Sequence, residues 1–162
     1  MYYSVDVEHE YQTIKSKLFR TSLLFAIILT FVLLADVLLV ALSKEDYLVC
    51  MIISIVITVI FIWFAIYFFT NVWSDINNQY RYFKGYESGL HPTEEVEFIL
   101  QDEELTYVNG LYVYRVHVRY ITNLDAQEKI IYSLKSKLPY DAGDKLTVTT
   151  YQRVIMASKR HK

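Results

Sequence analysis

Asp36 is the residue of this sequence whose placement most strongly suggests chemistry. It is the only charged residue in the apolar stretch from Leu23 to Leu42. A carboxylate near the centre of a bilayer costs on the order of 3 kcal/mol on insertion scales, so such residues mark ion paths, proton sites or polar helix contacts. Ser54 and Thr58 lie in the next apolar stretch, about as far beyond the intervening turn as Asp36 lies before it. We expect these three residues to form an intramembrane polar contact.

Three roles are open for this contact. Asp36, protonated or hydrogen-bonded to Ser54, would hold helices together within one chain or between copies of an oligomer. It would instead line a water-filled pore or act as a proton site, which requires several copies because two helices cannot enclose a path. In the third case Asp36 lies near the outer interface of the membrane and has no special role.

A second candidate site consists of basic residues on predicted strands. Arg115, His117 and Arg119 alternate along one strand, and Lys129 lies on the next. Alternate residues of a strand share a face, so these side chains form a basic stripe. Such a stripe is ordinarily the solvated face of a half-buried strand. The alternative is a contact for an anionic ligand, a lipid headgroup or an acidic partner.

Other kinds of chemistry find little support in the residue types. The four histidines, at positions 9, 91, 117 and 161, lack metal-ligand spacing, and the single Cys50 allows neither an intramolecular disulfide nor a thiolate cluster. The sequence has no Gly-rich phosphate loop and no nucleophilic serine motif. The net charge is -2, with no basic block outside the short tail Lys159–Lys162. We predict a protein that is not an enzyme and has no catalytic residue, cofactor, metal or nucleic-acid partner.

Two apolar stretches must position Asp36 and its partners. They cover about residues 21–43 and 47–70, and each is long enough to cross a hydrocarbon core of about 30 Å as a helix. Only a helix satisfies the backbone of a single segment in lipid. Four residues, 43–46, separate the two stretches. The sequence therefore predicts an antiparallel transmembrane hairpin over residues 19–73, with both termini on one side of the lipid bilayer.

The basic residues around this hairpin predict its orientation. Five of them flank it, at positions 15, 17, 20, 81 and 84, whereas the short turn contains only Lys44. Positively charged flanks stay in the cytoplasm, so we expect both termini there. The usage of many isoleucines and tyrosines and few glycines suggests a bacterial source. We expect a multi-pass protein of the bacterial inner (plasma) membrane.

Short amphipathic segments flank the hairpin on both sides. Residues 1–18 are predicted as an N-terminal amphipathic helix, and residues 74–92 as a second helix that ends near Gly85 and continues as a linker. Each segment carries apolar residues at helical spacing. We expect the two stripes to pack on each other as a cytoplasmic extension of the hairpin; they consist of Val7, Tyr11, Ile14 and Leu18, and of Val72, Ile76, Tyr80 and Phe83.

From Thr93 the apolar period changes to two, which predicts a small all-β domain over residues 93–162 with a basic tail. Asn109-Gly110 is the strongest hairpin signal in it. We expect five or six short strands in meander order, closed into a barrel because a flat sheet would expose two edges. On the strand after this turn, Tyr112, Tyr114 and Tyr120 are expected to point inward.

One segment of the predicted β domain resembles a turn of known barrel folds. Residues Leu138 to Val148, with Gly143, Asp144 and Lys145, resemble the turn that enters a strand in SH3-like and OB-like barrels. The resemblance implies a barrel of one of these two kinds. The overall plan, helices in the membrane before a small barrel, is similar to that of the NfeD-like membrane proteins.

Two functions of different classes fit this plan. The first is a non-enzymatic integral membrane protein whose cytoplasmic β domain is a membrane-tethered interaction or assembly module, with a protein partner or a homo-oligomer. The second is a ligand-sensing oligomeric membrane effector or small channel, similar in plan to some bacterial defence effectors; an immunity protein against a membrane-active toxin shares the topology. The barrel interior discriminates between the first two, because a filled interior favours the interaction module and a cavity favours the sensor.

Overall fold

The computed structural model describes residues 2–42, 47–121, 128–135 and 137–161. The chain forms two compact units. One consists of residues 13–77, and the other combines residues 1–12 with residues 78–162.

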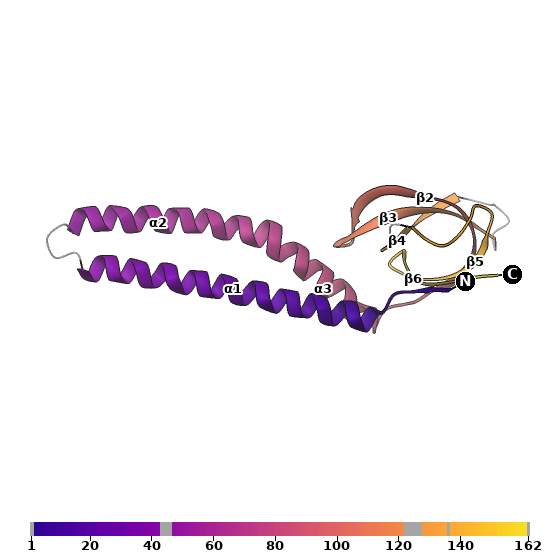
Figure 1. Cartoon of the computed structure of the whole chain (residues 1–162), viewed down its shortest axis with the longest axis horizontal. Helices are drawn as coiled ribbons and strands as arrows, with labels where there is room; N and C mark the ends of the chain where they lie inside the picture. The colour runs from indigo at the N-terminus through magenta and orange to yellow at the C-terminus, as the bar shows by residue number, and fades with distance from the viewer. Residues whose placement is uncertain (1, 43–46, 122–127, 136, 162) are drawn as a thin grey trace. The chain divides into compact units, whose positions relative to one another are not determined.

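Two long helices form most of the first unit. Helix α1 spans Val7–Leu42 and helix α2 spans Tyr47–Tyr67, and within residues 13–77 they lie side by side in opposite directions (Figure 1). By length and composition both are able to cross a membrane. Residues of lower exposure recur along each helix at spacings of three or four, as in a coiled-coil seam. They include Ile14, Leu18, Thr21, Phe25, Ile28, Val32, Ala35 and Leu39 on α1, Cys50, Ser54, Ile57, Phe61 and Ala65 on α2, and Phe68 directly after α2.

A π-helix, η1 (Phe68–Trp73), follows α2 without a break and leads into helix α3 (Ser74–Tyr86). This wider turn is not predicted by the sequence pattern. Two polar side chains bond to carbonyls at its start, with Thr70 Oγ1 donating to Ile66 O at 2.8 Å and Asn71 Nδ2 to Tyr67 O at 3.0 Å. The ring of Phe68 stacks on Phe25 of α1, with centroids 4.6 Å apart. Aromatic packing and side-chain bonding thus accompany the irregular turn.

The chain before the hairpin differs from the predicted helix over residues 1–18. Strand β1 (Tyr2–Ser4) pairs antiparallel with the last strand, and the helix begins only at Val7 and continues into the apolar stretch. Asp6 caps this helix, because its Oδ1 accepts a bond from His9 N at 3.0 Å. β1 forms because Tyr3, 4% exposed, contributes its ring to the barrel core. Of the two apolar stripes, Tyr11 and Tyr80 belong to the unit of residues 1–12 and 78–162, and their rings stack with centroids 5.5 Å apart, as expected for this pair.

The β domain is a closed five-stranded mixed barrel with β1 as a sixth strand outside it. Its strands pair in the order β1-β6-β4-β3-β2-β5, and the β5–β6 pair closes the ring. The expected meander is wrong in one place, because β4 and β6 pair parallel through Tyr132 and Val154. β2 is one long strand with bulges before Leu100 and before Leu105. The strands are β2 (Thr93–Val108), β3 (Leu111–Tyr120), β4 (Glu128–Ser133), β5 (Lys145–Tyr151) and β6 (Val154–Arg160).

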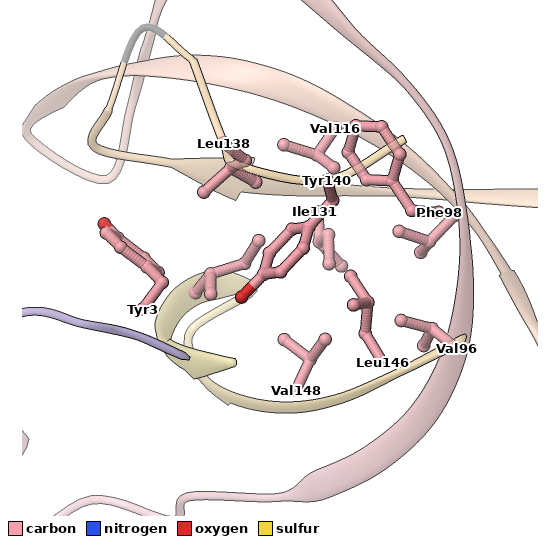
Figure 2. Close-up of a cluster of buried hydrophobic side chains, with 11 residues drawn as sticks. Tyr3, Val96, Phe98, Val116, Ile131, Leu138, Tyr140, Leu146 and Val148 are labelled. Carbon is pink, nitrogen blue, oxygen red and sulfur yellow. The ribbon is translucent and has the colours of Figure 1, made fainter. Parts of the chain in front are cut away.

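Apolar side chains fill the barrel interior (Figure 2). Val96, Val116 and Val118 are fully buried, and the Tyr140 hydroxyl bonds to Ser158 Oγ at 2.8 Å across the interior. The expectation that Tyr112 helps to fill the core is wrong, because its side chain is 54% exposed. The β2–β3 hairpin extends beyond the barrel at this point, so the residues of β3 in the core are Val116 and Val118.

Candidate functional site

Asp36 accepts two hydrogen bonds from the neighbouring helix of its own hairpin. Ser54 Oγ donates to Asp36 Oδ1 at 2.8 Å, and Thr58 Oγ1 donates to Asp36 Oδ2 at 3.1 Å. Ser54 and Thr58 are four residues apart, so one face of α2 presents both hydroxyls. The structure therefore brings together the three residues that the sequence pattern indicates, and each carboxylate oxygen has one donor from the same chain.

This geometry suits a structural contact. An ionised carboxylate is only an acceptor, and two hydroxyl donors compensate part of the loss of water around it. The same bonds fix the register of α1 against α2, because sliding either helix by one turn would separate the donors from Asp36. A role between copies or in a pore stays a prediction.

The basic stripe lies on the outer face of β3, where carboxylates neutralise much of its charge. Arg119 is 3.6 Å from Glu97 and 3.4 Å from Glu128, and His117 is 3.5 Å from Asp102. Glu97 and Glu128 are the cross-strand neighbours of Arg119 on β2 and β4. These pairings favour the solvated-face interpretation for this part of the stripe.

Arg115 and Lys129 differ from those two residues. Arg115 is exposed on the same outer face of β3. Lys129 is the cross-strand partner of the buried Val118, so it belongs to the other face of the sheet. Its Nζ lies 4.6 Å from the centroid of the Tyr120 ring. The structure thus does not bring all four predicted residues to one surface.

An exposed aromatic face, absent from the sequence-based candidates, lies on the β2–β3 hairpin. Leu105, Tyr107 and Tyr112 are 57%, 45% and 54% exposed, and the rings of Tyr107 and Tyr112 lie 5.0 Å apart. Tyr107 and Tyr112 are cross-strand partners, so both point to one side. The sequence signal that could have indicated this face is the alternation of large residues on both sides of Asn109-Gly110. We call these three residues the hairpin face.

The opposite side of this hairpin packs on α3 and on the β5–β6 turn. A Cβ on Gly110 would meet Asn78 Cβ at 2.7 Å, and Asn109 Nδ2 donates to Gln152 O at 3.2 Å. Leu111 and Val113 are buried on this side, at 4% and 0% exposure. Gly110 adopts a φ of 85°, which glycine tolerates without strain. The Asn-Gly turn therefore combines the required backbone conformation with a close approach to α3.

Tyrosines hold α3 to the turn between β5 and β6. Tyr82 donates its hydroxyl hydrogen bond to Tyr151 O at 2.8 Å, and burial raises the pKa of Tyr82 well above its ordinary value. Gly89 leaves room for the Tyr151 ring, which would lie 2.1 Å from an added Cβ. Burial, followed by a hydrogen bond to Glu94, raises the pKa of Tyr120 to about 12. These phenols are structural groups that stay protonated at neutral pH.

Within the described ranges, no group of three His, Cys, Asp or Glu residues is placed to hold a metal ion. Comparisons with protein-family models, with curated proteins and with solved structures find no match to this chain. The likeness to NfeD-like proteins thus stays a likeness of plan, and the choice between an SH3-like and an OB-like barrel stays a prediction.

Proposed function

We propose that this chain is a non-enzymatic integral membrane protein whose hairpin tethers the β domain to the cytoplasmic side of a cell membrane, where the domain acts as an interaction or assembly module. The filled barrel interior carries this proposal. Eleven buried side chains occupy it, so recognition by the barrel has to use its outer surface. Proteins that bind through a surface of this kind recruit a partner rather than enclose a small ligand.

The exposed faces of the two helices support the membrane part of the proposal. Away from the seam, large apolar side chains such as Phe31, Ile60 and Trp63 are 64–71% exposed. An apolar surface of this extent on helices of this length is stable in lipid rather than in water. The basic residues that flank the hairpin favour cytoplasmic termini, which supports a β domain on that side of the membrane.

The hairpin face is the surface that we propose for the protein partner. Exposed tyrosines next to an apolar residue are typical of interface centres, because they bury a large area at a small entropic cost. Tyr107 and Tyr112 already contact each other, so little order has to be gained when a partner covers them.

The test is to isolate the full-length protein in native-like lipid particles from its own cell membranes and to measure particle mass with and without Tyr112→Ser. We expect a companion protein whose retention falls at least tenfold in the variant, since truncation of a central interface tyrosine costs about 2 kcal/mol or more. Tyr2→Ser, at a tyrosine 66% exposed on β1, is the matched control and should retain the companion. Equal retention in both variants, or a chain that arrives alone, contradicts the proposal.

The alternative function, an oligomeric ligand-sensing effector or channel, predicts a different result. It predicts a defined homo-oligomer without a companion, with Asp36 at the contact between copies. The two hydroxyl bonds that Asp36 accepts within its own hairpin favour the interaction module instead. An immunity protein would be isolated with the toxin as its companion.

A further inference from the structure

We propose that a hollow beside α3, at the tips of the β2–β3 and β5–β6 hairpins, binds the phosphate of an anionic lipid headgroup. This inference rests on the proposed membrane placement and adds a lipid ligand to it. The hollow is a shallow, wide-open depression with a volume of about 340 Å³; its lining consists of Asn78, Arg81, Tyr82, Asn109, Gly110 and Gln152. All of these residues belong to one compact unit.

The lining offers hydrogen-bond donors and no carboxylate. Arg81 contributes a guanidinium, which matches a phosphate in charge and in the geometry of its paired N–H groups. Asn78 on α3 and Gln152 on the β5–β6 turn add side-chain amides to the lining. Gln152 Nε2 donates one hydrogen bond to the Tyr151 hydroxyl at 3.3 Å, which leaves its second N–H for a ligand. Asn109 fixes the shape of the site, because its Nδ2 bonds to Gln152 O at 3.2 Å. A phosphate with several acceptor oxygens fits this set of donors.

Backbone strain at the rim is a second, independent observation. Gln152 and Arg153 have φ values of 48° and 68° in the two-residue turn between β5 and β6. Asn and Gly tolerate this left-handed conformation, and the other hairpin uses them at Asn109 and Gly110. Gln and Arg have a higher steric energy in the left-handed conformation, and residues held in such conformations are frequent at binding sites. The strained turn places the Gln152 side chain in the lining of the hollow.

The covalent chain keeps the hollow close to the membrane surface. Asn78 follows Trp73, at the end of the apolar helical run, by five residues, and α3 is helical from Ser74 onward. Five helical residues rise about 7.5 Å along the axis. The headgroup region extends about 5–8 Å on each side of the hydrocarbon core, so Asn78 is within reach of headgroups when Trp73 lies at the edge of that core. Cytoplasmic leaflets also carry negative charge, which Arg81 complements.

The test compares phosphatidylglycerol and phosphatidylcholine bound to the full-length protein in detergent micelles, with lipid adducts counted by native mass spectrometry. We expect a preference for phosphatidylglycerol that falls about tenfold in Arg81→Gln and in Gln152→Glu, because each change removes or opposes a charge-assisted bond. Gln152→Glu keeps the side-chain shape, so it tests charge rather than folding. Arg115→Gln removes the same charge from the outer face of β3 and should leave the preference unchanged.

Three results overturn the proposal. They are an unchanged preference in both hollow variants, an equal loss in Arg115→Gln, and displacement of the lipid by millimolar inorganic phosphate, which indicates a site for free anions.

Quenching of Trp63 fluorescence by brominated lipid, in a Trp73→Phe background, distinguishes failure of the headgroup site from failure of the proposed function. If Trp63 is quenched and lipid preference is absent, the headgroup site is wrong and membrane insertion stands; if Trp63 is not quenched, the proposed function fails.

Discussion

The contact between Asp36 and Ser54 leads to a quantitative prediction for the stability of the helical hairpin. We expect Asp36→Ala and Ser54→Ala to show a coupling energy between about 0.6 and about 1.7 kcal/mol, which are the average and the maximum for hydrogen bonds between membrane helices. The bond length of 2.8 Å and the partial burial of both residues argue for the upper half of this range. Thr58, at 3.1 Å and more exposed, should couple more weakly to Asp36.

A double-mutant cycle is necessary because Asp36→Ala has two opposing effects. It deletes both interhelical bonds, which destabilises the hairpin by about 1–3 kcal/mol. It also removes a carboxylate that costs on the order of 3 kcal/mol to place in the bilayer. Its removal lowers the free energy of every state in which residue 36 lies in the membrane. The effect of the single variant therefore has no predictable sign, whereas the cycle cancels every term except the interaction between the two residues.

The assay is reversible unfolding of the full-length protein in mixed micelles with increasing dodecyl sulfate, followed by tryptophan fluorescence. Thr30→Val is the matched control for Thr58→Val, because the Thr30 hydroxyl donates to Ala26 O within its own helix. It should not couple to Asp36. Additive effects of Asp36→Ala and Ser54→Ala, or equal coupling of Thr30 and Thr58 to Asp36, would refute the contact as the origin of the stabilisation.

Two further predictions concern the β domain. Gly89→Ala should destabilise it by about 1–3 kcal/mol, since the new Cβ overlaps the Tyr151 ring; thermal unfolding should show a smaller loss in a Tyr151→Ala background, and an equal loss there would contradict the overlap. Tyr120 should make the free energy of unfolding depend on alkaline pH. Its folded-state pKa is raised from 10.0 to about 12, so its contribution is complete below pH 10 and disappears as the pH rises toward 12. Tyr120→Phe should weaken this dependence, and an identical pH profile would argue against it.

Much of the helical part was predictable because its determinants are local. The two apolar stretches have the length of membrane spans, and only four residues of sequence separate them, so they have to run antiparallel. With the turn and the helical rise known, residues at equal distance from the turn come to the same height. Local spacing alone is therefore enough to pair Asp36 with Ser54. The same reasoning could not predict η1, because apolar spacing along the chain contains no signal for a π-helix, whose first residue Phe68 contacts Phe25 of the other helix.

Some features of the barrel were determined by the sequence, and others were decided only by the tertiary structure. Alternation of apolar residues and the Asn109-Gly110 turn determined that strands form and where β2 meets β3, since both are properties of neighbouring residues. Only the tertiary structure decided that Tyr2–Ser4 joins β6, that β4 and β6 pair parallel, and that Arg119 lies between two glutamates. These features depend on which strands lie next to each other after the ring closes, and alternation along one strand contains no information about its neighbours.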